Sequence, residues 1–363
     1  MNSESVWLKL TVLRGIAAIY VMAHHLRNAF WWAVKDVSKE TEPTLYWING
    51  LVGGIFRFGN LSVLAFFVVS GISIHLATLE RGCHFQAMSY FKRRAQRLYP
   101  TLISSLLLTA ICVQFSAPDY FLSINSLFDV LGTLAFQQTV LVAPFGGNTP
   151  YWSLANEGYY YTLYPLLLFL VPRIALMSLL VCVTGLIFAG SLLKPDLHPV
   201  IAYFPVWLLG VTVAGQIFEG KKASWKLRIL GLSLVFGAMV TKIFENLITW
   251  PGQTSLQLLG GVGLGLIIPS YVEWSPMRAV GGKLTRAFAK LGEISFPLYA
   301  THYPIISLAD SWVPNLERSL LTTSLMSAAV AFICILVAWI LHHWVEMPYL
   351  NQSKRERACS LNK

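Results

Sequence analysis

Residues 13–26 read LRGIAAIYVMAHHL, and this stretch indicates what kind of protein the chain is. It is apolar over nearly four helical turns, yet it contains one arginine and two histidines. It lies in an apolar run from about 7 to 32, which is long enough to cross the ~30 Å hydrocarbon core of a bilayer. Because the run lacks a small-residue cleavage site, we interpret it as a first membrane span and not as a removable signal peptide.

The composition extends this interpretation to the whole chain. Of its 363 residues, 55% are hydrophobic and only 12% are charged, about half of the ~25% that is usual in a soluble domain. A soluble enzyme, a disordered chain and a fibrous repeat are therefore excluded. We predict an all-α polytopic membrane protein with about ten transmembrane helices in one bundle. Residues 1–350 are expected to form the transmembrane domain, and residues 351–363 a short basic cytosolic tail. The expected spans cover about 7–32, 48–79, 101–117, 153–171, 174–193, 199–218, 229–248, 254–272, 294–309 and 319–344.

The segment from Leu127 to Ala143 is ambiguous, because it is apolar but contains Asp129 and two glutamines. If it does not cross, the loops at 80–99, 219–228 and 273–290 share a side with the tail, and together these segments hold 17 lysines and arginines against four in the opposite loops. Basic loops remain in the cytosol. The sequence thus predicts both termini in the cytosol and a short re-entrant or interfacial segment near 127–150.

The formal net charge of +10 fits this pattern of loops and does not indicate a nucleic-acid partner. The five cysteines have no repeating spacing, so the sequence predicts no disulfide framework and no metal site.

Ionisable residues inside spans are rare and usually functional. Arg14 and His25 are eleven residues apart, which at ~100° per residue places them on one helix face with a rise of ~16 Å between them. His25 would lie in the outer part of the membrane. The structural alternative is an arginine that reaches the inner headgroups and a histidine at the outer helix end.

A second candidate segment is YWSLANEGYYYTLYP at 151–165. Ser153 is expected to cap the helix, and Glu157 lies one turn further, where a carboxylate could orient an imidazole. Trp152 and the tyrosines could equally form an interfacial aromatic belt.

The third candidate is LGEISFPLYATHYPI at 291–305. Ser295 and His302 are seven residues apart and share a face of the predicted helix. A buried histidine satisfied by a hydroxyl group is the structural alternative.

The cluster FKRRAQRLYP at 91–100 contains four cations. It is typical of an anionic-lipid patch at the cytosolic surface, but the guanidinium groups of Arg93, Arg94 and Arg97 could also clamp phosphates.

These segments, in this order, resemble the acyltransferase-3 family of integral-membrane acyltransferases, in its stand-alone form. The resemblance extends from about Leu10 to Pro348. It rests on RGIAAIYVMAHH, FFVVSGISI, RRAQRLYP, YWSLANEGYYYTLYP, LGEISFPLYATHYPI and VEMP.

The resemblance implies transfer of an acyl group, most often acetyl, from cytosolic acyl-coenzyme A to a hydroxyl group of an extracytoplasmic carbohydrate or glycoconjugate. The protein would then be located in the bacterial inner membrane, without a metal. His25 is expected to act as general base or as transient acyl carrier. The expected site residues are His25, Glu157 and His302 for catalysis, Arg14, Arg93, Arg94 and Arg97 for the donor, and Trp152, Ser153 and Ser295 in support. A transporter or flippase for a lipid-linked glycan is the alternative from another functional class.

Overall fold

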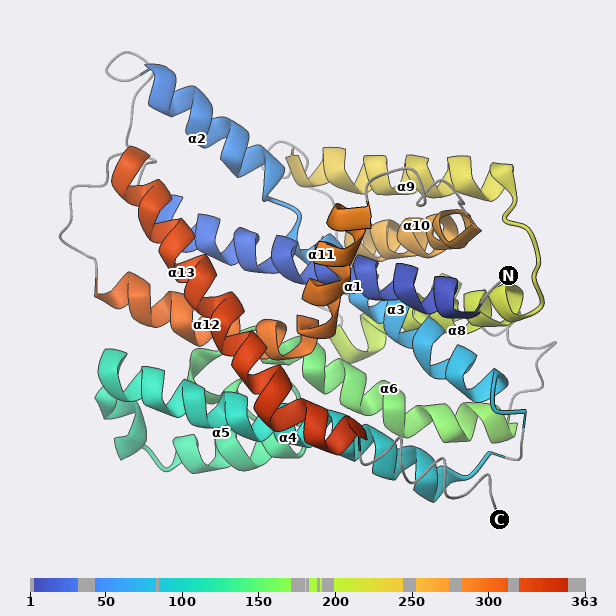
Figure 1. Ribbon diagram of the computed structural model, residues 1–363, viewed down its shortest axis with the longest axis horizontal. Coiled ribbons are helices and arrows are strands. Elements are labelled where there is room, and N and C mark those ends of the chain that lie inside the picture. Colours follow the sequence, from blue (N-terminus) through green and yellow to red (C-terminus); the bar gives the residue numbers. More distant parts are fainter. Residues whose placement is uncertain are drawn as a thin grey trace. The chain divides into compact units, whose positions relative to one another are not determined.

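The computed structural model of the chain describes residues 3–31, 43–82, 85–170, 180, 183–187, 190, 199–243, 253–273, 282–312 and 320–351. Every named element in these ranges is a helix, and no strand occurs among them (Figure 1). This confirms the predicted all-α class. Most of the predicted span at 174–193 and all of 352–363 lie outside the described residues.

Five described stretches are long and apolar enough to cross a membrane. Together with the apolar composition, these stretches identify the chain as a membrane protein. The stretches are Ser3–Trp31, Tyr46–Leu79, Ala87–Ser116, Pro199–Phe218 and Leu321–Asn351.

By its internal contacts the chain divides into two compact units. Unit 1 comprises residues 1–17, 60–85 and 156–292. Within it, α9 and α10 lie side by side, and α10 also packs on α8 (Figure 1). Its helices are the first part of α1 (Ser3–Leu26), α3 (Gly59–Leu79), most of α6 (Tyr151–Leu170), α8 (Pro199–Phe218), α9 (Trp225–Ile243), α10 (Gln253–Glu273) and α11 (Gly282–Glu293).

Pairs of glycines bring helices of unit 1 into backbone contact. A Cβ atom on Gly231 of α9 would lie 2.8 Å from the carbonyl oxygen of Gly263 in α10, and one on Gly263 would lie 2.7 Å from the carbonyl oxygen of Gly231. Helices in membranes associate largely through such close packing of small residues, because lipid tails compete with apolar side chains. Similar reciprocal contacts join α1 to α11 and α3 to α8, through Gly15 with Gly292 and Gly71 with Gly210.

Unit 2 comprises residues 18–59, 86–155 and 293–363. Its central helix is α12, which packs against both α4 and α13 and buries most of its side chains. Its elements are the rest of α1, the π-helix η1 (Arg27–Trp31), α2 (Pro43–Ile55), α4 (Ala87–Ser116), η3 (Pro118–Leu122), α5 (Asn125–Leu134), η4 (Phe145–Gly147), α12 (Ser295–Ser311), α13 (Leu320–Leu341) and the π-helix η7 (His342–Glu346).

The predicted span at 48–79 lies within the apolar stretch Tyr46–Leu79, but it is not one continuous helix, because the chain turns at 56–58 between α2 and α3. Side chains of α1 form hydrogen bonds with backbone carbonyl groups at the end of α2. The Tyr20 hydroxyl group donates to the carbonyl of Ile55, and His24 Nδ1 lies 2.6 Å from the carbonyl oxygen of Phe56. A helix end leaves carbonyl groups without partners inside the helix, so these contacts stabilise the break.

The segment near 127–150 contains only one α-helix, α5, of ten residues. At ~1.5 Å per residue it is about 15 Å long and cannot cross the bilayer, in agreement with the predicted re-entrant or interfacial segment. One face of α5 buries Asp129 and Thr133, whereas the opposite face exposes Leu127, Phe128 and Leu131. The helix is therefore amphipathic, as expected of a segment at the membrane interface.

A small network fixes the fold of this segment. The Tyr120 hydroxyl group of η3 donates to Asp129 Oδ2 at 2.7 Å and accepts the N–H group of Gly146 at 3.0 Å. Burial raises the pKa of Tyr120 to about 12, so its hydroxyl group stays protonated at neutral pH.

Candidate active site

Unit 2 brings two of the predicted catalytic residues together. The ring centroids of His25 on α1 and His302 on α12 are 5.2 Å apart, with 47° between the ring planes. Tyr303 meets His25 edge-on, with its ring centroid at 5.1 Å. The two histidines come from opposite ends of the sequence, and the contact between α12 and the η1 segment that follows His25 places them side by side.

His302 is held in one tautomer by its surroundings. Its side chain is 1% exposed, and its Nδ1 lies 3.0 Å from the carbonyl oxygen of Leu298, one turn earlier in α12. Because a carbonyl only accepts hydrogen bonds, the proton of neutral His302 is on Nδ1. Its Nε2 is buried and has no hydrogen-bond partner among the described residues. A buried acceptor without a partner suggests a place for a substrate hydroxyl group or a water molecule.

The neighbouring His24 and His25 have different surroundings. His24 donates from Nδ1 to the carbonyl of Phe56 at 2.6 Å, and its Nε2 accepts from Asn28 Nδ2 at 3.1 Å. Both ring nitrogens of His24 are therefore engaged in holding α1 to the end of α2. The contacts of His25 in this structure are with the rings of His24, His302 and Tyr303. This geometry favours His25 over His24 for chemistry.

The predicted cap at Ser153 is wrong. α6 already begins at Tyr151, and Ser153 is buried in its first turn, where its hydroxyl group donates to Tyr299 Oη at 2.8 Å and lies 3.2 Å from the carbonyl oxygen of Pro150. The Tyr299 ring in turn contacts His302, with a centroid distance of 5.8 Å. Ser153 is thus linked through Tyr299 to the histidine pair.

Two other residues expected to support the site lie on the same helices. Trp152 is half-buried in the first turn of α6. Ser295 is fully buried at the first position of α12, two turns before His302.

Glu157 lies in unit 1, on the part of α6 that follows Ala155. Its Oε2 accepts the hydroxyl group of Tyr161 at 2.8 Å, and that hydroxyl group lies 3.0 Å from Ser70 Oγ of α3. The carboxylate is therefore held in place within unit 1 by a buried tyrosine. Its predicted role beside His25 stays a prediction.

The arginines predicted to bind the donor belong to two helices. Arg14 is half-buried on α1 in unit 1, directly before Gly15, which contacts α11. The other arginines lie in the first three turns of α4 in unit 2, where they are half-buried. The guanidinium group of Arg94 lies over the ring of Tyr90, 5.7 Å from its centroid. The α4 group consists of Arg93, Arg94 and Arg97.

Sequence reasoning missed a buried polar network in unit 2. Asn148 donates from Nδ2 to the carbonyl of Ala300 at 3.1 Å and to Thr109 Oγ1 at 3.3 Å, and the hydroxyl group of Tyr151 contacts Ser105 and Thr109. The network connects the chain before α6 to α4 and α12. The asparagine in the turn GGNTP was the available signal, because asparagine side chains in turns commonly form hydrogen bonds with backbone groups.

Sequence reasoning also missed the pair His342 and Glu346 in η7. The two side chains are buried, with His342 Nδ1 2.7 Å from Glu346 Oε2. η7 packs against α4, the helix that carries the arginine cluster. Glu346 is the glutamate of the VEMP segment at 345–348, and its place in a recognised motif was the signal that could have drawn attention to it.

Comparison with known proteins shows the family of the chain. A family model described as an acyltransferase domain, Acyl_transf_3, matches residues 7–343. The chain belongs to this acyltransferase family. It is also similar to Acyltransferase MdmB of Streptomyces mycarofaciens, with 24% identity over 380 residues that cover 96% of this chain and 92% of that protein. No solved structure matches the chain. The protein is therefore a membrane acyltransferase.

Proposed function

We propose that this acyltransferase transfers an acyl group, most often acetyl, from acyl-coenzyme A on the cytosolic side to a hydroxyl group of an extracytoplasmic carbohydrate or glycoconjugate. The observation that carries the proposal is the contact between His25 and His302. His302 uses Nδ1 for its hydrogen bond to the carbonyl of Leu298, and its buried Nε2 has no partner among the described residues. Two imidazoles side by side can supply a general base and a hydrogen-bond acceptor for a substrate hydroxyl group.

In the direct route, His25 removes the proton of the acceptor hydroxyl group as the oxygen attacks the thioester carbonyl carbon. The tetrahedral intermediate then collapses, the carbon–sulfur bond breaks, and the thiolate of coenzyme A takes the proton from the imidazolium. His302, through its Nε2 lone pair, can accept a hydrogen bond from a neighbouring hydroxyl group of the acceptor and so orient the acceptor. Tyr299 and Ser153 would hold His302 in position.

In the relay route, His25 itself attacks the thioester carbonyl carbon, and the acyl group moves to an imidazole nitrogen as coenzyme A leaves. The acceptor oxygen then attacks this acyl-imidazole and regenerates the ring. The two routes differ in the order of events, because only the relay releases coenzyme A in the absence of an acceptor.

The donor side of the proposal rests on charge. Guanidinium groups bind phosphate oxygens in a bidentate manner, and α4 presents Arg93, Arg94 and Arg97 within two turns. Arg14, on the same helix as His25, would contact the donor between the phosphates and the reacting thioester. The distribution of basic loops supports a cytosolic location for both termini and for the arginine cluster.

The test compares His25→Ala with His24→Ala in the purified protein, by release of coenzyme A and by mass spectrometry of the surface glycan from cells that express each variant. We expect His25→Ala to abolish transfer with normal membrane insertion, because removing an ionisable group from a span does not hinder insertion. His24→Ala should lower stability through its lost bonds but retain most of its activity. Equal loss of activity in the two variants, at equal amounts of folded protein, would contradict the assignment.

A further inference from the structure

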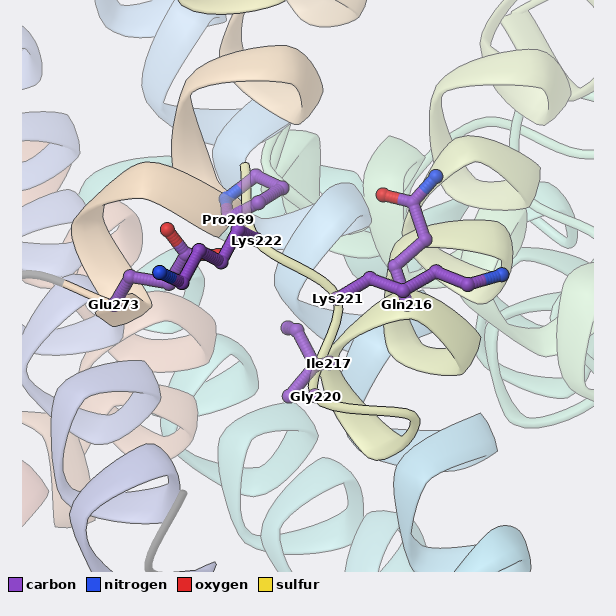
Figure 2. Close-up of a pocket in the computed structure, with 7 residues that line it drawn as sticks. All are labelled: Gln216, Ile217, Gly220, Lys221, Lys222, Pro269 and Glu273. Carbon is purple, nitrogen blue, oxygen red and sulfur yellow. The ribbon is translucent and has the colours of Figure 1, made fainter. Parts of the chain in front are cut away.

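A pocket of about 340 Å³ lies in unit 1, between the end of α8, the loop that follows it and the end of α10. Its walls combine two lysines, a carboxylate and an amide with two apolar side chains (Figure 2). The lining residues are Gln216, Ile217, Gly220, Lys221, Lys222, Pro269 and Glu273.

The pocket has a fixed frame. The loop turns at Gly220, which has a φ of 66°, a conformation that favours glycine. The carboxylate of Glu273 at the end of α10 accepts the N–H group of Ala223 from the loop. Arg228 Nε in the first turns of α9 donates to Ser270 Oγ of α10 at 3.0 Å. The loop and the start of α9 are therefore each held to α10 by one hydrogen bond, and the lysines extend from a defined backbone.

The two lysines carry the positive charge of the pocket, whose wall also includes the carboxylate of Glu273. In Figure 2 the side chain of Lys222 lies on the side of Glu273 and Pro269, while that of Lys221 runs beside Gln216 on the other side of the loop. Lys221 Nζ lies 2.6 Å from Glu219 Oε2, but the two side chains are 68% and 51% exposed. An exposed ion pair of this kind contributes little to stability. Lys221 can therefore leave Glu219 and bind an anionic ligand at little cost.

The helix next to the pocket has an apolar surface. Leu227, Ile229 and Phe236 of α9 are 44%, 54% and 69% exposed, as expected of side chains that face lipid tails. Trp225, at the start of α9, is 64% exposed and carries Lys226 Nζ over its ring at 5.9 Å. Tryptophan and lysine at a helix end are typical of the headgroup region. The pocket thus lies at the depth of lipid headgroups, beside a surface for acyl chains.

We propose that this pocket binds the headgroup of an anionic phospholipid. The phosphate would lie over the loop, where the flexible side chains of Lys222 on one side and of Lys221 on the other can turn toward it (Figure 2). A glycerol headgroup would donate hydroxyl groups to the Gln216 amide and the Glu273 carboxylate. Basic pockets between helices at a membrane surface are suited to such headgroups. A soluble phosphate compound has the same phosphate chemistry but would leave the apolar surface of α9 unused. The site is independent of the acyl-transfer chemistry proposed above.

The experiment is native mass spectrometry of the full-length protein in detergent, titrated with phosphatidylglycerol. Glutamine replaces each lysine, because it keeps a polar side chain and removes the charge. At roughly 1 kcal/mol per basic residue near an anionic surface, Lys221→Gln and Lys222→Gln should each weaken retention about 5-fold, and the double variant about 30-fold. Lys226→Gln is the matched control, since Lys226 lies nearby but does not line the pocket, and it should change retention less than 2-fold.

Two competitors identify the source of the phosphate. Phosphatidylcholine should be retained more weakly than phosphatidylglycerol, and coenzyme A should not displace the bound lipid. Displacement by coenzyme A or inorganic phosphate would assign the pocket to a soluble phosphate and overturn the proposal. Equal weakening by Lys226→Gln and the pocket variants would also overturn it, because the surface charge in general would then explain retention. If the double variant does not fold, the two single variants give the same comparison.

Discussion

Replacing Gly231 with alanine should test the close contact between α9 and α10. The new Cβ atom would lie 2.8 Å from the carbonyl oxygen of Gly263 and 3.0 Å from side-chain carbons of Leu266 and Ile267. The helices would have to move apart by several tenths of an ångström. Such overpacking costs about 1–3 kcal/mol, whereas alanine in place of glycine within a helix gains about 0.5–1 kcal/mol. We therefore expect a net destabilisation of about 1–2 kcal/mol.

The matched control is Gly237→Ala on the same helix, where a Cβ atom meets nothing within 4 Å. This variant should be more stable than the parent by up to about 1 kcal/mol. The measurement is unfolding of the purified variants in mixed micelles, followed by circular dichroism as the denaturing detergent is increased. Two variants of equal stability, or a stabilised Gly231→Ala, would refute the reasoning, because α9 and α10 could then not be in backbone contact.

Three further predictions concern the site and its surroundings. Ser153→Ala should lower kcat about 5-fold and leave the KM for the donor unchanged, because the lost hydrogen bond to Tyr299 contributes about 1 kcal/mol to the position of His302. Steady-state kinetics at varied donor concentration measure both constants, and a change in KM with unchanged kcat would contradict this role. Arg97→Lys should weaken binding of coenzyme A by one to two orders of magnitude because lysine lacks the guanidinium fork, and unchanged affinity in calorimetry would remove Arg97 from the donor site. Tyr120→Phe should leave the buried Asp129 without its donor at a cost of about 1–3 kcal/mol; faster hydrogen exchange in residues 118–150 would report it, and unchanged exchange would contradict it.

The helices were largely predictable, because a bilayer imposes length and apolar composition on each span. The predicted run at 199–218 coincides with α8, and those at 254–272 and 294–309 differ from α10 and α12 by one or two residues. The break at 56–58 within the run at 48–79 was not predicted, because the turn is as apolar as its flanks, apart from one arginine. Hydropathy cannot detect a break that depends on hydrogen bonds from α1.

The sequence named candidate residues for the site but could not predict their contacts. Helical periodicity placed His25 and His302 on faces of their own helices, yet it contains no information on which faces meet. The contact between them depends on the packing of α12 within unit 2. Ser153 was misjudged because a serine near a helix start usually caps it, and only the position of Tyr299 reveals that the hydroxyl group donates instead.

The Nε2 of His302, which has no hydrogen-bond partner in the described part of the chain, also has a consequence for the stability of the resting enzyme. A buried acceptor without a donor costs a folded protein about 1–3 kcal/mol, and a ligand that binds only the folded state stabilises it in proportion to its occupancy. A sugar whose hydroxyl group reaches this nitrogen should therefore raise the melting temperature even when no donor is present. Thermal-shift screening of sugars could then identify the acceptor before any turnover is measured, with a His302→Phe variant as the background in which the response disappears.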